Sequence, residues 1–222
     1  MIDINTLYLE SKKSIKSYRE YREISKILND RIFDYLETTQ KGLNDINIMG
    51  LLKNNRVYLD KNIEFDYCHD FILYEKTLNN KSGVDLFLES HKLEDKSEIE
   101  LIESMKNSKT SLYKVIDIDK KDFKIKIEDI NTKEIINIID ISLSRTLDKD
   151  HLVFTRIISI GDVNFTSGMV MLFNLNHIDF LERVAKKEMK KLNIENENVK
   201  RFITFFYLSR QHGYNMTLTP TT

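Results

Sequence analysis

The hydrophobic period changes twice along this chain, and that change constrains the fold more than any other feature. From about Ser111 to Phe173 the apolar residues recur mainly at every second position, and on both sides they recur at every third or fourth. A period of two is typical of strands with one buried face, and a period near 3.6 is typical of amphipathic helices. We therefore expect a sheet in mid-chain, with helices before and after it.

The central stretch predicts five strands joined by short connections. Lys120-Lys121-Asp122 and Gly161-Asp162 have the composition of tight hairpin turns. Strands joined this closely should be antiparallel, because parallel crossovers need a dozen or more residues. We expect a meander that forms either a five-stranded antiparallel sheet or a partly closed small barrel, with Gly168 marking a bulge or bend. The predicted strands are 112–119, 123–128, 134–141, 151–160 and 163–173.

The flanking segments predict helices with one apolar face each. The first helix should contain Ile15 to Leu36 and end near Gly42, because glycine favours a helix C-cap. The last helix should be buried, because it is apolar on most sides. The other helical segments are expected at about 43–52, 62–77, 84–89, 98–107 and 178–192, with the last at 199–209 and a short extended piece at 56–60.

These periods define the fold class and the organisation of the chain. The fold class is α+β, with a helical region at 1–108, the sheet or barrel at 109–175 and C-terminal helices at 176–212 that pack on the same core. Residues 213–222 are expected to be a flexible tail. The N-terminal helix could complete the core or form a separate arm or dimer contact.

Composition and missing motifs exclude several classes of protein. Lys and Arg number 34 against 35 Asp and Glu, which argues against a protein whose main work is holding nucleic acid. The single cysteine, Cys68, rules out an internal disulfide and a thiolate zinc cluster, and it suits a reducing cytoplasm. We find no secretory signal, no membrane-spanning run and no glycine-rich phosphate loop. We therefore expect a cytoplasmic protein with no membrane association, metal or nucleotide cofactor.

Asp66, His69 and Asp70 are the best acid–base or metal-ligand candidates. Their spacing places them on one face of the predicted 62–77 helix. That face is opposite the apolar side formed by Phe65 and Cys68, so we expect it to be solvated, which is ordinary for charged residues on a surface helix. The alternative is a common ion or proton held by all three. Cys68 should be an inert core thiol.

Glu64 and Glu75 both fall within the apolar stripe of the same predicted helix. Buried carboxylates must be paired or shifted in pKa. Each could be a general acid or base. The interpretation we favour is a glutamate at a helix end that reaches solvent or pairs with an arginine.

Two sets of basic residues are candidate binding residues. Arg156 lies within an apolar strand, where it could point outward to solvent, as we expect, or inward to clamp a carboxylate. With Arg145 and His151 it could form an anion site at the end of the sheet. The second set lies at the basic end of the helix after the sheet and comprises Arg183, Lys187 and Lys190. Glutamates lie between these cations, which weakens an interpretation as a nucleic-acid site.

The stretch from about 66 to 173 resembles uncharacterised bacterial proteins, some of which carry a SEC-C zinc motif. The resemblance rests on the order of four parts: 70–74 (DFILY), then Gly83 with 86–88 (LFL), then Ser108 with 111–115 (SLYKV), then 154–157 (FTRI). The zinc motif is absent, because one cysteine cannot supply it. The resemblance implies a non-enzymatic bacterial domain and transfers no site residues.

Two functions remain open from the sequence. The first is a non-enzymatic intracellular binding or interaction protein, whose partner is a protein or a second copy of the chain rather than nucleic acid. The alternative is a metal-assisted hydrolase or nuclease that uses Asp66, His69 and Asp70.

Overall fold

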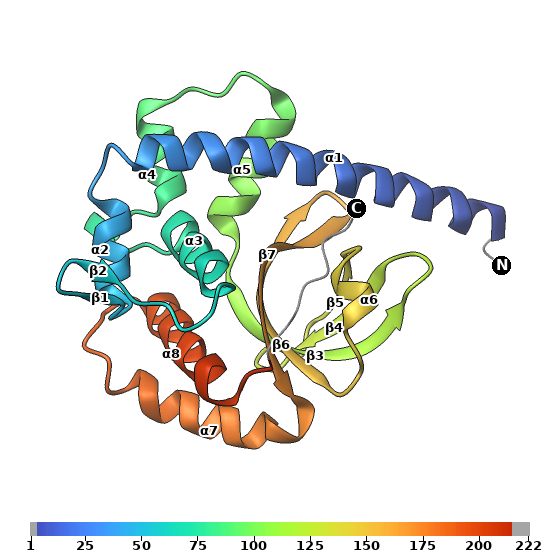
Figure 1. The fold of residues 1–222 in the computed structure, drawn as a ribbon. Helices are drawn as coiled ribbons and strands as arrows, with labels where there is room; N and C mark the ends of the chain where they lie inside the picture. Colours follow the sequence, from blue (N-terminus) through green and yellow to red (C-terminus); the bar gives the residue numbers. More distant parts are fainter. Residues whose placement is uncertain (1–3, 215–222) are drawn as a thin grey trace.

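A curled five-stranded antiparallel sheet forms one side of the molecule, and helices α1, α3, α5 and α8 contact one of its faces (Figure 1). The computed structural model describes residues 4–214, with side chains from residue 12 onward. The fold class is therefore α+β, as the change in hydrophobic period predicts. The helices are α1 (Ile4–Leu36), α2 (Lys41–Ile48), α3 (Glu64–Tyr74), α4 (Gly83–Ser90), α5 (Lys96–Asn107), α6 (Leu143–Thr146), α7 (Ile178–Met189) and α8 (Glu197–His212), with 3₁₀ turns at Leu78–Asn80 and Leu175–His177.

The main sheet has the strand order β5-β4-β3-β6-β7, and every neighbouring pair is antiparallel. The predicted plain meander is therefore wrong at one step, because β6 pairs with β3 instead of β5. The connection before β6 forms α6 and buries Leu143 and Leu147 against the sheet, which carries the chain across to the other side of β3. The strands are β3 (Thr110–Asp119), β4 (Lys124–Asp129), β5 (Ile135–Ile139), β6 (His151–Ile160) and β7 (Val163–Asn174), and a separate hairpin pairs β1 (Leu52–Lys53) with β2 (Arg56–Val57).

The sheet does not close, so the partly closed barrel is not found. Strands β5 and β7 approach each other at the edges of the curl, and the Asn164 side-chain amide donates to the Asn137 carbonyl at 3.1 Å. The ladder nevertheless ends with β5 at one edge and β7 at the other. The curl requires local irregularities, and the pairing register shifts once in β3 and again between β6 and β7.

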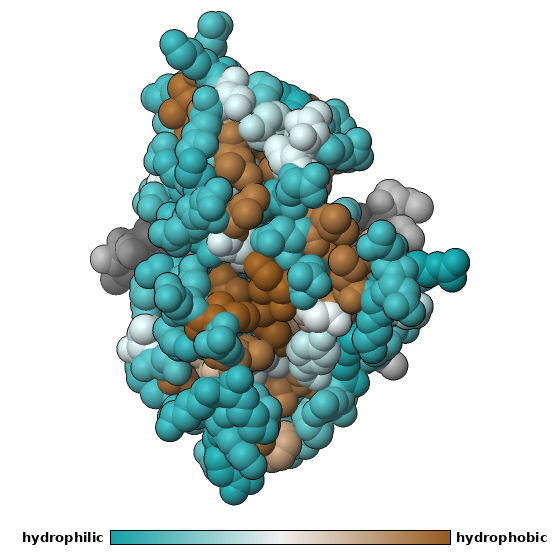
Figure 2. All heavy atoms as spheres, turned by 90° about the vertical axis from the view of Figure 1, so that its left-hand side faces the viewer, coloured by the Kyte–Doolittle hydropathy of each residue, from teal (hydrophilic) through white to brown (hydrophobic). Residues whose placement is uncertain are grey.

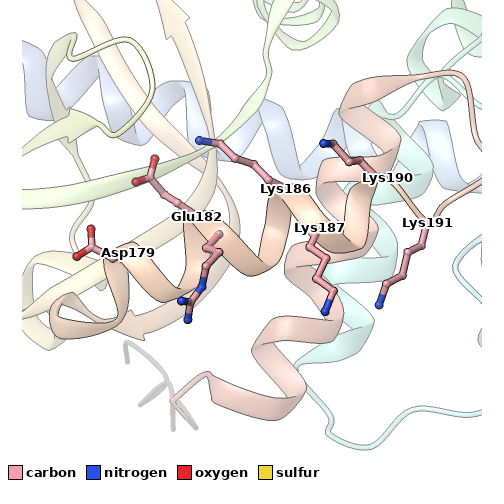
Figure 3. A pocket seen from close by; sticks show the side chains of 7 residues that line it. Asp179, Glu182, Lys186, Lys187, Lys190 and Lys191 are labelled. Carbon is pink, nitrogen blue, oxygen red and sulfur yellow. The ribbon is translucent and has the colours of Figure 1, made fainter.

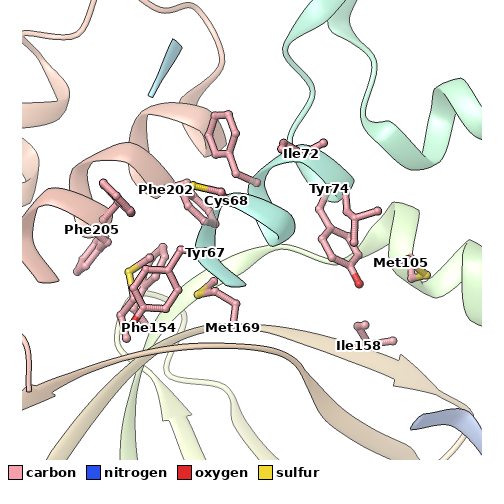
Figure 4. Close-up of a cluster of buried hydrophobic side chains, with 14 of the residues drawn as sticks. Tyr67, Cys68, Ile72, Tyr74, Met105, Phe154, Ile158, Met169, Phe202 and Phe205 are labelled. Atoms are coloured by element: carbon pink, nitrogen blue, oxygen red, sulfur yellow. The ribbon is translucent and has the colours of Figure 1, made fainter. Parts of the chain in front are cut away.

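Two hydrophobic clusters stabilise the sheet from its two faces. The larger cluster lies on the helical side and draws residues from α1, α3, α5, α7, α8 and the strands. Within it, Phe154 of β6 stacks on Phe205 of α8 with ring centroids 4.3 Å apart, and Figure 4 shows α3 lying between α8 and the sheet. The smaller cluster lies on the other face, where α6 covers it.

One sequence expectation about a helix end is corrected, and the predicted tail lies mostly outside the described residues. Helix α1 ends at Leu36, and Gly42 lies inside α2 instead of capping α1. Of the predicted tail, 215–222 lie outside the described residues, while the Tyr214 backbone N–H donates to the Leu172 carbonyl at 2.9 Å. Within the described part of the chain, no helix combines the length and hydrophobicity needed to span a membrane.

Candidate functional site

A buried arginine connects the sheet to helix α3. Arg156 of β6 is 1% exposed, so the expectation that it points to solvent is wrong and the inward alternative holds. Its Nε donates to Asp70 at 3.0 Å, its Nη2 donates to Glu75 at 2.6 Å, and its Nη1 donates to the Ser108 carbonyl at 3.1 Å. The guanidinium carbon also lies 4.4 Å from the centre of the Tyr74 ring. A buried charge needs partners of this kind, because its removal from water is unfavourable.

The backbone after α3 is held by a second buried cation. Lys41 of α2 is fully buried and donates to Asp45 at 2.5 Å and to the Glu75 carbonyl at 3.0 Å. Thr77 closes the group by donating to Asp45. Both cations therefore hold the segment around Glu75 in place.

A bulge in β7 lies opposite Arg156. The ladder pairs Thr155 with Val170 and Ile157 with Thr166, which leaves 167–169 of β7 facing a single residue of β6. Gly168 has φ +108°, a conformation that side chains with a Cβ rarely adopt. The expected bulge at Gly168 is therefore confirmed. It turns Ser167 toward α3, where its hydroxyl donates to Asp70 at 2.5 Å.

The bulge forms the floor of a hollow between α1, α3 and β7, which we call the α1–α3–β7 pocket. Its volume is about 560 Å³, within the range of small-molecule sites. Polar and charged side chains alternate with a few apolar ones around it. The lining comprises Arg22, Glu23, Ser25, Lys26, Asn29, Asp30 and Phe33 of α1, Asp66, His69, Asp70, Leu73 and Tyr74 of α3, and Ser167, Gly168 and Met169 of β7.

Two polar atoms in this lining are buried without a hydrogen-bond partner: the Tyr74 hydroxyl and the Asn29 side-chain carbonyl. Figure 4 shows the Tyr74 hydroxyl directed from α3 toward the sheet. Burial and then the nearby Asp70 carboxylate raise the pKa of Tyr74, so its hydroxyl stays protonated at neutral pH. Buried polar groups are nearly always paired, so these two unpaired atoms are exceptions to the general pattern.

The rim of the pocket is charged and partly fixed. Arg22 donates to the Thr166 carbonyl at 3.2 Å, and its guanidinium nitrogens lie 3.7 and 3.9 Å from the point where a Gly168 Cβ would stand. His69 lies with its ring centre 4.6 Å from that of Phe33. A small polar molecule entering here would meet a cation, an imidazole and carboxylates.

The three acid–base candidates all line this pocket, but they are not equivalent. Asp66 and His69 are exposed as expected, whereas Asp70 is 4% exposed and bonded to Arg156 and Ser167. The expected solvated face is therefore wrong for Asp70, because α3 is covered on more than one side. Phe65, expected in the core, is 56% exposed. Among the described residues, no three His, Cys, Asp or Glu side chains are grouped closely enough to hold a metal ion.

The two glutamates in the apolar stripe of α3 are both buried, and each is paired with an arginine. Glu75 accepts from Arg156, and Glu64 accepts from Arg210 of α8 at 2.9 and 2.6 Å. Of the two expected alternatives, solvent contact or an arginine partner, the arginine partner is found, since Glu64 is 1% exposed and Glu75 3%. Burial raises the pKa of Glu75, and Arg156 opposes that rise.

The anion site expected from Arg156, Arg145 and His151 is not assembled. Arg145 is exposed and lies over the Phe123 ring at 5.6 Å. His151 accepts from the Asp148 backbone N–H at 3.0 Å. Arg156 is enclosed among α3 and the β7 bulge, so the three side chains lie in different surroundings.

The basic side chains at the C-terminal end of α7 point in different directions. Arg183, Lys187 and Lys190 are exposed and line a shallow surface with Lys186 and Lys191. Figure 3 shows Lys186 and Lys190 pointing to one side of the helix and Lys187 and Lys191 to the other. These cations do not converge on one ligand.

The side of the molecule seen from the left of Figure 1 also carries apolar surface. Figure 2 shows hydrophobic side chains gathered in a hollow band between polar borders on this face. Helix α2 and the β1–β2 hairpin lie on this side (Figure 1). Leu43, Val57 and Tyr58 in this region are 54%, 50% and 47% exposed.

Comparison with known proteins gives one match. A protein-family model described as a family of unknown function, DUF7986, matches residues 12–219. No curated protein matches the chain, and no solved structure matches it. The finer resemblance to bacterial proteins that carry a SEC-C motif stays a prediction.

Proposed function

Since the chain belongs to this DUF7986 family of unknown function, we propose from its contacts that it is a non-enzymatic binding protein that holds a small polar molecule in the α1–α3–β7 pocket. The observation that carries the proposal is the pair of buried, unpartnered polar atoms on Tyr74 and Asn29. A ligand with an acceptor for the Tyr74 hydroxyl and a donor for the Asn29 carbonyl would satisfy both. A buried donor or acceptor without a partner destabilises a fold by about 1–3 kcal/mol, so a ligand that bonds to these atoms would gain free energy of that order.

The rest of the site supports binding over catalysis. Asp70, the most buried carboxylate in the pocket, has one oxygen on Arg156 and the other on Ser167. A carboxylate held in this way positions the walls of the site and is not available to take a proton from a ligand. The Arg156 cluster therefore serves to keep α3 and the β7 bulge in a fixed relation.

The test compares two buried tyrosines of α3 that differ in their hydrogen bonds. Tyr67 donates to the Val170 carbonyl at 3.1 Å, whereas the Tyr74 hydroxyl has no partner. In ligand-free protein, Tyr67→Phe should lower the free energy of unfolding by about 0.5–1.5 kcal/mol, and Tyr74→Phe should leave it unchanged or raise it. Urea denaturation measures both. An equal loss in both variants would mean that the Tyr74 hydroxyl has an internal partner, and the proposal would fail.

The ligand itself can be sought without knowing its identity. Wild-type and Tyr74→Phe protein are purified in parallel and denatured, and the small molecules released are compared by mass spectrometry. We expect a compound that is enriched with the wild type and reduced at least tenfold with the variant. Equal recovery from both, or no enriched compound from either, would count against a ligand at this pocket.

We also propose that the protein acts in the cytoplasm and that its macromolecular partner is a protein or a second copy of the chain. The single thiol, Cys68, is buried, and burial raises its pKa to about 12. Such a thiol is unreactive and needs no oxidising compartment. The near balance of charges and the diverging lysines of α7 favour a protein partner over nucleic acid.

A metal-assisted hydrolase or nuclease is the second candidate, and one observation favours it: Asp66, His69 and Asp70 line the same pocket. Asp66 and His69 would have to supply the metal ligands, with Asp70 holding their helix in place. Titration with Mn²⁺, Mg²⁺ and Zn²⁺ should then raise the melting temperature of the wild type but not that of His69→Ala. We expect no difference between the two proteins, and a rise specific to the wild type would move this candidate to first place.

A further inference from the structure

A second hollow lies on the other side of Tyr74 and collects positive charge. It has a volume of about 280 Å³, and lysines come to it from three segments: Lys76 after α3, Lys106 of α5 and Lys109 before β3. Buried Arg156 and Glu75 also line it. We call it the lysine pocket. Its lining therefore carries four cations and one carboxylate.

The three lysines of the lysine pocket are weakly compensated, whereas Arg156 is paired with both Asp70 and Glu75. Lys76 and Lys106 are each 3.9 Å from a carboxylate oxygen, on Asp85 and Glu103 respectively, which is the distance of a loose, solvent-screened pair. No ion pair to Lys109 is found within the described chain. An excess of positive charge in a concave site is favourable only when an anion neutralises it.

The lysine pocket also contains unused hydrogen-bond donors. A guanidinium has five N–H groups, and three of those on Arg156 bond to Asp70, Glu75 and the Ser108 carbonyl. Two remain on a side chain that is 1% exposed and lines the hollow. Arg156 shares its charge between Asp70 and Glu75, so the excess positive charge of the hollow comes from the three lysines.

We propose that the lysine pocket binds a phosphate group, either as inorganic phosphate or as part of a small phosphorylated metabolite. A phosphate dianion offers several acceptor oxygens to donors that approach from different directions, and lysine and arginine are its usual ligands in proteins. The contrast with the C-terminal end of α7 is informative, because its four lysines point apart (Figure 3). This site shares only Tyr74 with the α1–α3–β7 pocket, and the proposal does not rest on the ligand proposed there.

The experiment measures phosphate binding by isothermal titration calorimetry on the full chain. The probes are inorganic phosphate and glycerol phosphate, with acetate at matched ionic strength as the comparison. The test variant is Lys106→Gln/Lys109→Gln, and the matched control is Lys186→Gln/Lys190→Gln on α7. All four lysines are exposed, so both double variants should fold, and circular dichroism verifies this.

We expect the wild type and the α7 control to bind phosphate equally and the pocket variant to bind at least tenfold more weakly. Tighter binding of glycerol phosphate than of inorganic phosphate would identify a metabolite as the source of the group, and the reverse would identify the free ion. Equal losses in both double variants would show non-specific attraction and overturn the proposal. So would acetate binding as tightly as phosphate, or no binding by the wild type at millimolar concentration.

Discussion

At the scale of single residues, the buried cluster around Arg156 contains more negative than positive charge. Arg156 compensates both Asp70 and Glu75, each of which is almost fully buried. Lys41 contributes from the other side, but it is also committed to Asp45. Burial raises the pKa of Glu75 in spite of its arginine, and the Asp70 carboxylate adds to that rise.

Glu75→Gln should therefore change how stability depends on pH. The folded-state pKa of Glu75 lies above the ordinary value of 4.5, because of burial, with Arg156 and Lys41 opposing and Asp70 adding to the rise. Above pH 4.5 the folded chain holds a proton that the unfolded chain has lost, so wild-type stability falls as the pH rises through this window. The Glu75→Gln variant has no titrating group at this position, so its stability does not fall in this way as the pH rises. Relative to wild type, its free energy of unfolding should therefore increase as the pH rises from 4.5 toward 7.

Urea denaturation at a series of pH values measures this difference. The control is Glu94→Gln, because Glu94 is exposed and its replacement should give a nearly constant offset. A parallel pH dependence of wild type and Glu75→Gln would contradict the prediction.

At the scale of elements, the β7 bulge positions the floor of the α1–α3–β7 pocket. Gly168→Ala should lower the free energy of unfolding by about 1–3 kcal/mol, because alanine is strained at the φ of +108° found there. Gly161→Asn is the matched control. Gly161 has φ +55° in open space, and asparagine tolerates that left-handed conformation. Chemical denaturation measures the free energy of unfolding of both variants. An equal effect at the two glycines would mean that the backbone conformation at Gly168 does not strain alanine.

The elements themselves were largely predictable, because each depends on local hydrophobic period. All five strands of the main sheet begin and end within two residues of their predicted bounds, and α8 is buried on most sides as expected. The order of the strands was not predictable in this way. Whether β6 pairs with β5 or β3 depends on the path of the connection through α6, which local alternation does not encode.

The site was less predictable than the elements. The i, i+3, i+4 spacing of Asp66, His69 and Asp70 correctly placed them on one side of α3, but it could not show that Asp70 meets a distant arginine. The signal for Arg156 was present, since a charge in the middle of an apolar strand must either face water or find a buried partner. Lys41 and Tyr74 gave no local signal, because their roles arise from contacts between distant segments.

At the scale of the whole molecule, one hydrophobic cluster includes residues from the regions 1–108, 109–175 and 176–212. A fragment of 109–175 alone would expose the helix-facing side of its sheet, including Phe154, Phe165 and Phe173, all fully buried in the full chain. We expect this fragment to lack a cooperative thermal transition and a dispersed amide NMR spectrum, both of which the full chain should show. A fragment with a dispersed spectrum would mean that the sheet folds independently of the helices.

Tyr74 lines both the α1–α3–β7 pocket and the lysine pocket, with its ring against the Arg156 guanidinium. The Tyr74 side chain therefore forms part of the wall of both pockets. If both are occupied, a ligand that pushes this ring from one side alters the room available on the other, so the two affinities are linked through a single side chain. The same sharing restricts which substitutions of Tyr74 are tolerated, because a change that favours ligand binding in one pocket also changes the shape of the other.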